Sequence, residues 1–212
     1  MLRRTKPPTS VRWFNAVATA GGAGHNWFER WAGVGVFLEP WLGRRATNVL
    51  WAVSPPLMLR SAVGDRSRAD DVVMAFNAGV SVASVVVHFI DWPWSRRLGV
   101  FPWLDEAEGL PPRLLAPYNA VLWTWGIGGA GSILFETSRR DLKFVAAGLI
   151  AGPLLLASAR HHFVWAREKA LGDTSGQWSP IFTAGLADGE PMPATRRESL
   201  RPELRTDSTP TD

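Results

Sequence analysis

Long stretches without charged side chains occupy the middle of the chain. No Asp, Glu, Lys or Arg occurs in residues 72–90 or 114–135, and the uncharged stretch 144–159 continues apolar beyond Arg160. A helix rises about 1.5 Å per residue, so about 20 residues cross a hydrocarbon core of roughly 30 Å. A soluble helix needs a polar face, which these stretches lack. The pattern therefore predicts membrane-spanning helices, and a soluble all-α protein with apolar core helices is the alternative.

The predicted fold class is an all-α integral membrane protein, a polytopic helical bundle of four transmembrane helices. The predicted spans are about 44–60, 71–91, 114–136 and 143–165. The first span contains Pro55-Pro56, and its uncharged part, residues 46–59, is short enough to be a re-entrant or interfacial segment instead.

The two ends of the chain have a different composition from the bundle. Residues 1–43 are predicted to be a cytoplasmic segment that lies on the membrane surface and is broken at Gly21–Gly24. Residues 166–212 combine Gly, Pro, Ser, Thr and mixed charge, which is typical of a flexible tail. Trp178, Ile181 and Phe182 interrupt this tail, either to dock on a surface or as a chance cluster.

The distribution of basic residues predicts the orientation in the membrane. With four spans, 17 of the 23 Lys and Arg residues fall on the side that holds both termini. Because cytoplasmic segments are rich in Lys and Arg, the prediction is a multi-pass protein of the cell membrane with both termini in the cytoplasm. Trp residues near the ends of the apolar stretches, such as Trp27, Trp31 and Trp165, are typical of the membrane interface.

Composition excludes several kinds of chemistry. The chain has no cysteine, which excludes disulfides, thiolate metal sites, iron–sulfur clusters and a cysteine nucleophile. The net charge is +4, and the basic residues are dispersed over all the predicted loops, which suits anionic lipid headgroups and not nucleic acid. The frequent Ala, Arg and Gly indicate a GC-rich bacterial genome, and hence a bacterial inner membrane.

Small residues recur at helical spacing. Residues 126–131 read Gly-Ile-Gly-Gly-Ala-Gly, which matches a dinucleotide-binding fingerprint. The second strand and its acidic end are missing after the motif, so we interpret these glycines as helix-packing positions. The predicted packing residues are Gly79, Gly126, Gly128, Gly148 and Gly152.

A polar stripe follows the second predicted span. Asn77, Ser81, Ser84 and His88 are spaced by four, three and four residues, and Asp91 continues the series. This spacing places them on one helical face, which hydrocarbon would penalise, so the stripe is predicted to face the bundle interior.

Histidines suggest a candidate site near the end of that stripe. Under the four-span topology, His88 and Asp91 lie in the same membrane leaflet as His161 and His162. Such a cluster is compatible with haem b held between His88 and one of His161 or His162, with a metal ion, or with a quinone headgroup. The alternative is that these residues join helix ends by hydrogen bonds and bind nothing. No separate metal-ion site is predicted, because the acidic loop Asp105–Glu108 lacks converging ligands.

No complete catalytic constellation occurs in the sequence. The first hypothesis is therefore a non-catalytic membrane protein that acts by helix packing with itself, with a partner membrane protein or with lipids. The second is a membrane redox subunit that binds haem b or quinone near the histidines. The third is a small transporter, which would have to form an oligomer to enclose a pathway.

Overall fold

The computed structural model describes residues 11–64, 67–90, 93–97 and 100–183 and confirms the prediction of a mostly helical protein. The helices are α1 (Trp13–Ala32), α2 (Glu39–Val63), α3 (Arg68–His88), α4 (Pro112–Gly131), α5 (Leu142–Ile150) and α6 (Gly152–Leu171). A π-helical turn, Ser132–Glu136, extends α4, and short 3₁₀ turns cover Arg139–Asp141 and Pro180–Phe182. Two short strands, β1 (Trp94–Arg97) and β2 (Trp103–Ala107), form an antiparallel hairpin.

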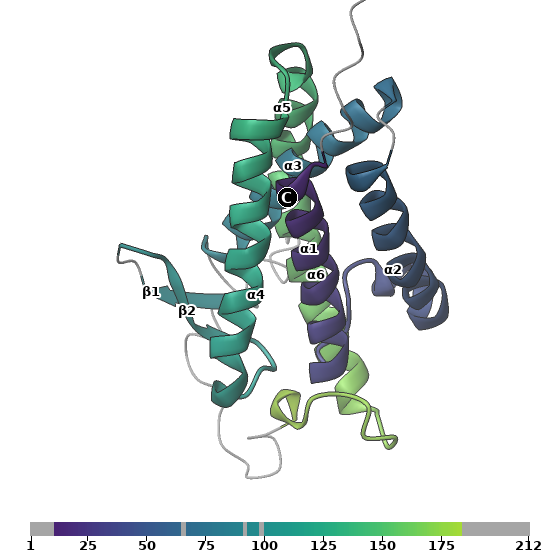
Figure 1. The fold of residues 1–212 in the computed structure, drawn as a ribbon. Coiled ribbons are helices and arrows are strands. Elements are labelled where there is room, and N and C mark those ends of the chain that lie inside the picture. Colours follow the sequence, from purple (N-terminus) through teal and green to yellow (C-terminus); the bar gives the residue numbers. More distant parts are fainter. Residues whose placement is uncertain (1–10, 65–66, 91–92, 98–99, 184–212) are drawn as a thin grey trace, which may run out of the picture.

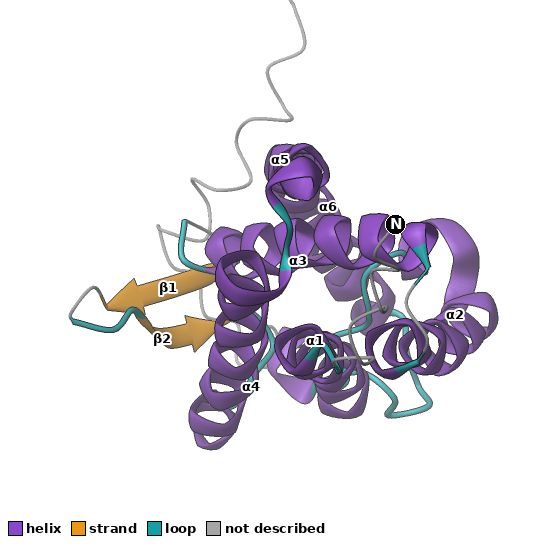
Figure 2. Ribbon diagram, turned by 45° about the horizontal axis from the view of Figure 1, so that its top comes forward, coloured by secondary structure: helices purple, strands orange, loops and turns teal. Residues whose placement is uncertain are grey.

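Helix α1 is the central element of the bundle (Figure 1). It packs most extensively on α4 and also contacts α2 and α3. Figure 2 shows α1 with α4, α3 and α2 on three of its sides, and α5 and α6 beyond α3. Helices α1 and α2 run in opposite directions, since Arg12 at the start of α1 bonds to Ser61 near the end of α2, whereas Arg30 near the end of α1 pairs with Glu39 at the start of α2.

The predicted break at Gly21–Gly24 is wrong, because α1 is continuous through these residues. The glycines serve close packing instead: a Cβ on Gly21 would lie 2.7 Å from the backbone nitrogen of Trp125 in α4. The N-terminal segment is thus part of the bundle, and its buried face meets α4 backbone to backbone.

Other glycines form the closest helix crossings. A Cβ on Gly79 would meet the backbone of Val145 and Gly148, and a Cβ on Gly148 would meet Phe76 and Val80 in α3. In α4, a Cβ on Gly128 would meet the backbone of α1, and a Cβ on Gly126 would meet the side chain of Val85 in α3. Gly152 differs, since a Cβ there would be 3.9 Å from its nearest neighbour, the Cβ of Ala83. The tight crossing therefore joins α3 to α5 through Gly79 and Gly148.

Two helical stretches in the described chain are long and apolar enough to cross a membrane: Arg68–His88 and Arg139–Leu171. The first covers residues 71–88 of the predicted span 71–91, and the second contains the predicted span 143–165. Helix α2 contains the predicted span 44–60, and α4 with the π-helical turn after it covers the predicted span 114–136, but neither helix meets the same combination of length and hydropathy. Helix α2 is interrupted by the non-helical Gly43 but continues through Pro55 and Pro56 to its end.

The β-hairpin was not predicted, because its few residues read as a charged loop. It packs on α4 through the amide of Asn119, which accepts a hydrogen bond from the backbone nitrogen of Leu104 and donates one to the Leu104 carbonyl. These bonds occupy backbone groups at the edge of β2. The hairpin in turn places the buried Trp94 beside His88.

The prediction of a flexible tail from residue 166 is wrong for its first part. Helix α6 continues to Leu171, and the following segment returns to the bundle, where the backbone nitrogen of Ser179 donates to the Gly33 carbonyl. Phe182 is 1 % exposed and completes the main apolar core, which gives this segment its fixed place. In the turn that follows α6, the carboxylate of Asp173 accepts hydrogen bonds from the side chain and the backbone nitrogen of Ser175, and these bonds lower the pKa of Asp173. The rest of the predicted tail lies outside the described residues.

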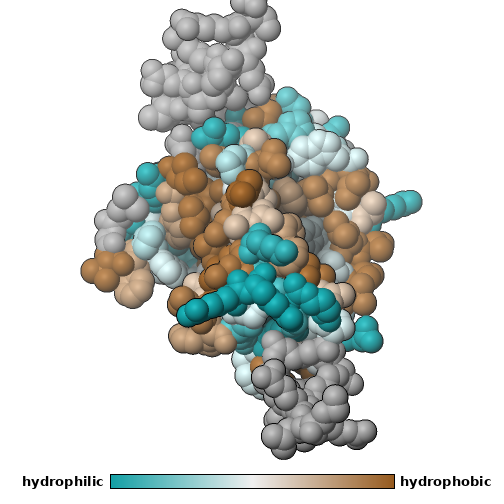
Figure 3. All heavy atoms as spheres, turned by 90° about the horizontal axis from the view of Figure 1, so that it is seen from above, coloured by the Kyte–Doolittle hydropathy of each residue, from teal (hydrophilic) through white to brown (hydrophobic). Residues whose placement is uncertain are grey.

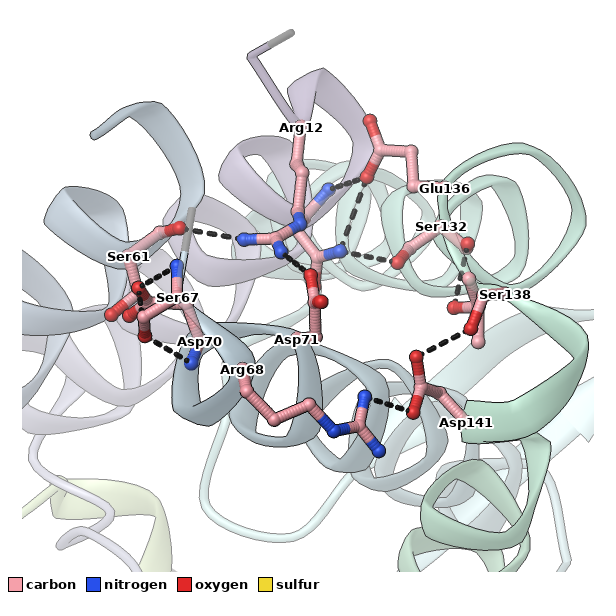
Figure 4. A network of polar contacts seen from close by, with 12 residues as sticks. Arg12, Ser61, Ser67, Arg68, Asp70, Asp71, Ser132, Glu136, Ser138 and Asp141 are labelled. Atoms are coloured by element: carbon pink, nitrogen blue, oxygen red, sulfur yellow. Dashed lines mark hydrogen bonds and ion pairs between the residues drawn. The ribbon is translucent and has the colours of Figure 1, made fainter. Parts of the chain in front are cut away.

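A polar network closes the other end of the bundle (Figure 4). The carboxylate of Glu136 accepts hydrogen bonds from the backbone nitrogens of Phe14 and Asn15, which have no partners within the first turn of α1. Arg12 pairs with Asp71, and Arg68 pairs with Asp141. This end joins α1, α2, α3 and the turn after α4.

The described chain begins and ends at opposite ends of α1. Arg12 lies in the network just described, whereas Ser179 is bonded to Gly33, the residue after the last turn of α1. The four-span prediction places both ends of the chain on the same side. In the structure α1 is an additional helix of the bundle, and the two ends of the described chain lie at opposite ends of it.

Candidate functional site

The interior of the bundle is unusually polar. Buried polar residues come from every long helix and include Asn15, Thr19, His25, Asn26, Glu29, Thr47, Ser81, Ser84, His88, Asn119, Ser132 and His162. A buried polar group costs free energy unless it is bonded, so such a set calls for partners inside the bundle.

Helix α1 contributes the largest share of this interior. Asn15, Thr19, Gly22, His25 and Glu29 are buried and follow one another by three or four residues. This spacing keeps them on one face of the helix, which is turned to α3 and α4. His25 and Glu29 are one turn apart, so their side chains lie beside each other.

Four side chains converge at the centre of the site. The Nε2 atom of His25 lies 2.9 Å from Nε2 of His88 and 3.0 Å from the hydroxyl of Tyr118. The Tyr118 hydroxyl donates to Oε1 of Glu29 at 2.9 Å, and this oxygen is 3.4 Å from Nε2 of His25. All four residues are buried, and they come from α1, α3 and α4. We call these four residues the His–Glu–Tyr cluster.

The ring of His88 has a defined orientation. Its Nδ1 lies 2.6 Å from the carbonyl oxygen of Ser84, one turn earlier in α3. Because a carbonyl oxygen only accepts, Nδ1 carries the proton, and Nε2 of the neutral ring presents a lone pair to the cluster. Trp94 of the hairpin packs on the same ring, with 4.1 Å between the ring centroids.

A cavity of about 120 Å³ lies next to the cluster. It is lined by His25, Asn26, Glu29, Phe37, Trp51, Val80, Ser84, Val87, His88, Trp94, Trp125, Leu155, Ala159, His162 and Phe163. Its size is similar to the roughly 150 Å³ of engineered cavities that admit benzene. The cavity thus suits an ion with a water molecule or one small ring.

The structure brings together part of the predicted site. Ser81, Ser84 and His88 are buried in the bundle, whereas Asn77 is half-buried. His162 lines the same cavity as His88. His161 is exposed and packs on Trp41 outside the cavity, with ring centroids 5.0 Å apart. Asp91 lies outside the described residues.

Three members of the cluster, His25, Glu29 and Tyr118, were not predicted as site residues. The sequence does carry a signal for two of them: the polar and small residues of α1 repeat at the same three- and four-residue steps as the stripe on α3. The same spacing also fits one face of a segment that lies on a membrane surface, which is the prediction for residues 1–43. For Tyr118 no spacing in its own helix indicates a role, since its partners come from other elements.

The cluster offers two imidazole nitrogens, a carboxylate and a phenol hydroxyl. Ligand atoms of His25, Glu29 and His88 all lie within 4.8 Å of one another, close enough to share one metal ion. The same groups can pass a proton along the bonded series Glu29, Tyr118, His25 and His88. The arrangement does not suit haem between His25 and His88, since axial nitrogens on opposite sides of an iron are about 4 Å apart.

No family model, curated protein sequence or solved structure is significantly similar to this chain. The functional argument therefore comes from the geometry of the site and from the surface of the bundle.

Proposed function

We propose that the protein is an integral membrane protein whose bundle crosses the bilayer several times and encloses the polar site. The observation that carries this proposal is the distribution of side chains: many large apolar residues are exposed on the outside of the helices, while many polar residues are buried inside beside the apolar core. Water would favour the reverse, whereas hydrocarbon favours the observed arrangement.

The exposed apolar surface is large and lies mainly on helices. Leu134, Phe135, Ile150 and Leu154 are each 73–75 % exposed. Figure 3 shows apolar side chains on the flanks of the molecule around a cluster of polar ones at one end. Such contiguous patches are rare on soluble monomers and mark contact with lipid or with another protein.

The segment Arg139–Leu171 gives further support. It is apolar enough to cross a membrane, yet only 11 % of its most apolar window is buried inside the protein. The core helix of a soluble protein would be mostly buried, so this segment needs an apolar environment from outside. The same exposed faces can also bind a second copy or a partner membrane protein, as the first hypothesis from the sequence holds.

A second candidate function is a membrane redox subunit. The observation in its favour is the cavity with three histidines, His25, His88 and His162, of a size that admits one planar ring. A quinone headgroup is such a ring, and it accepts hydrogen bonds from imidazole. Extraction of the purified protein with organic solvent and identification of the quinone would test this candidate.

The main proposal predicts sidedness for cysteine labelling. The chain has no cysteine, so single variants at exposed positions carry one thiol each. Ala69→Cys and Arg139→Cys lie at the Arg12 end of the bundle, and Arg113→Cys and Thr174→Cys lie at the other. If α1 to α6 cross the membrane, a membrane-impermeant maleimide added on one side should label only the pair at the Arg12 end. Added on the other side, it should label only the second pair.

The results separate insertion from topology. Recovery of the protein in the soluble fraction after lysis without detergent would contradict membrane insertion itself. Labelling of Arg139→Cys and Thr174→Cys from the same side would contradict the proposed crossings, and also the four-span arrangement, which likewise places these two positions on opposite sides. The basic residues leave the orientation open here, since they divide 13 to 10 between the two ends.

A further inference from the structure

We propose that His25, Glu29 and His88 bind one divalent first-row transition-metal ion, with the hydroxyl of Tyr118 as a fourth ligand. The proposal goes beyond membrane insertion and does not depend on it, because it follows from the packing of α1, α3 and α4 alone.

The distances within the cluster match a shared metal ion. Bonds from a metal to imidazole nitrogen or carboxylate oxygen are about 2.0–2.2 Å, so tetrahedral ligand atoms are about 3.3–3.6 Å apart. The atoms of the cluster are separated by 2.9 Å for His25 and His88, 3.4 Å for His25 and Glu29, and 2.9 Å for Tyr118 and Glu29. The remaining pair, Glu29 and His88, has its ligand atoms within 4.8 Å of each other, so a rotation of these side chains toward a common centre brings the set to bonding distance.

The donor types select the class of ion. Two imidazoles and one carboxylate are the protein ligands of catalytic zinc sites and of non-haem iron(II) sites. Imidazole suits Zn, Fe, Ni and Cu, whereas an all-oxygen shell would suit Mg or Ca. The buried carboxylate of Glu29 supplies one negative charge toward the ion.

The surroundings hold the ligands in place before an ion arrives. The bond from Nδ1 of His88 to the Ser84 carbonyl leaves Nε2 as the metal-binding nitrogen, which is the usual outer-shell arrangement of metal-binding histidines. Helical spacing fixes Glu29 beside His25. The cavity on the open side of the cluster leaves room for a water molecule or small ligand on the ion.

The hydrogen bonds of the cluster alone leave buried atoms unsatisfied. Within the described residues, Nδ1 of His25 and Nε2 of His162 have no hydrogen-bond partner, and both residues line the cavity. Polar atoms buried in this way are costly unless a water molecule or ion satisfies them. Water molecules held in the cavity beside the ion would supply those partners.

Metal titration of the full chain tests the proposal. The protein is purified in detergent, stripped with a chelator and titrated with Zn²⁺ by calorimetry and with Co²⁺ by visible absorption. We expect one ion per chain and ligand-field bands of Co²⁺ at an imidazole-containing site. His25→Gln, Glu29→Gln and His88→Gln should each weaken binding by more than about 100-fold, since changes even in outer-shell residues weaken metal sites by 10–100-fold.

His161→Gln is the matched control, because it removes an imidazole of the same chain that lies outside the cavity. Its affinity should equal that of the unmodified protein, and His162→Gln should stay within a few-fold of it. Binding of the unmodified protein only in the millimolar range would overturn the proposal, and this result needs no variant to fold. Equal affinity in His88→Gln and the unmodified protein, with helicity retained by circular dichroism, would also overturn it.

Discussion

Replacement of Gly148 by leucine is expected to abolish the folded bundle, and replacement by alanine to lower the free energy of unfolding by about 1–3 kcal/mol or more. The reason is the crossing of α3 and α5. A Cβ on Gly148 would meet the Phe76 carbonyl oxygen and lie 2.7 Å from the backbone nitrogen of Val80. Backbone atoms cannot rotate away as a side chain can, so the two helices have to separate.

Gly152→Ala is the matched control for this prediction. It makes the same chemical change four residues later, where the added Cβ would have only an ordinary contact with Ala83. Alanine favours the helix over glycine by up to about 1 kcal/mol, so this variant should be neutral or more stable. Unfolding of both variants in detergent, followed by circular dichroism, gives the comparison. Equal stability of Gly148→Ala and Gly152→Ala would show that the crossing is looser than the structure indicates.

Phe182→Ala is expected to lower the free energy of unfolding by about 3–5 kcal/mol, the usual cost of removing a buried aromatic ring. The ring is 1 % exposed and belongs to the apolar core that also contains Tyr118 and Phe163. It packs against Gly109, where a Cβ would lie 2.6 Å from the ring, and against Val34. Its loss should free the segment after α6 from the bundle.

Limited proteolysis after α6, together with thermal unfolding, would measure this effect. The neighbouring Ile181→Ala is the control, because Ile181 is only half-buried and its truncation should cost about 1 kcal/mol or less. Rapid cleavage between residues 172 and 182 in the unmodified protein, at the same rate as in Phe182→Ala, would contradict the docked position of this segment.

The proposed metal site and the proposed membrane location explain different features of the same bundle. Exposed apolar helices such as α5 and α6 call for a surrounding apolar phase. The buried His–Glu–Tyr cluster calls for a charged partner, or for water, in the interior. Because fractionation tests the first and metal titration tests the second, failure of one leaves the other standing.

Local sequence patterns determined much of the fold. The uncharged stretches around residues 72–90 and 144–159 correspond to parts of α3 and of α5 and α6, because a helix satisfies the backbone hydrogen bonds of a long apolar run internally. The steps of three and four residues from Ser81 to His88 correspond to a buried face of α3. Both features depend on helical periodicity alone, which a single sequence contains.

Tertiary packing decided the rest. The position of α1 inside the bundle depends on the close contact of Gly21 with Trp125 in α4. The position of Phe182 depends on its contact with Gly109. The candidate site depends on the same packing: His25, His88 and Tyr118 are up to 93 positions apart, and only the association of α1, α3 and α4 brings their side chains within 3.0 Å of one another along the bonded series. Periodicity shows which face of each helix is buried, but the partner of that face is set by the shape of other helices.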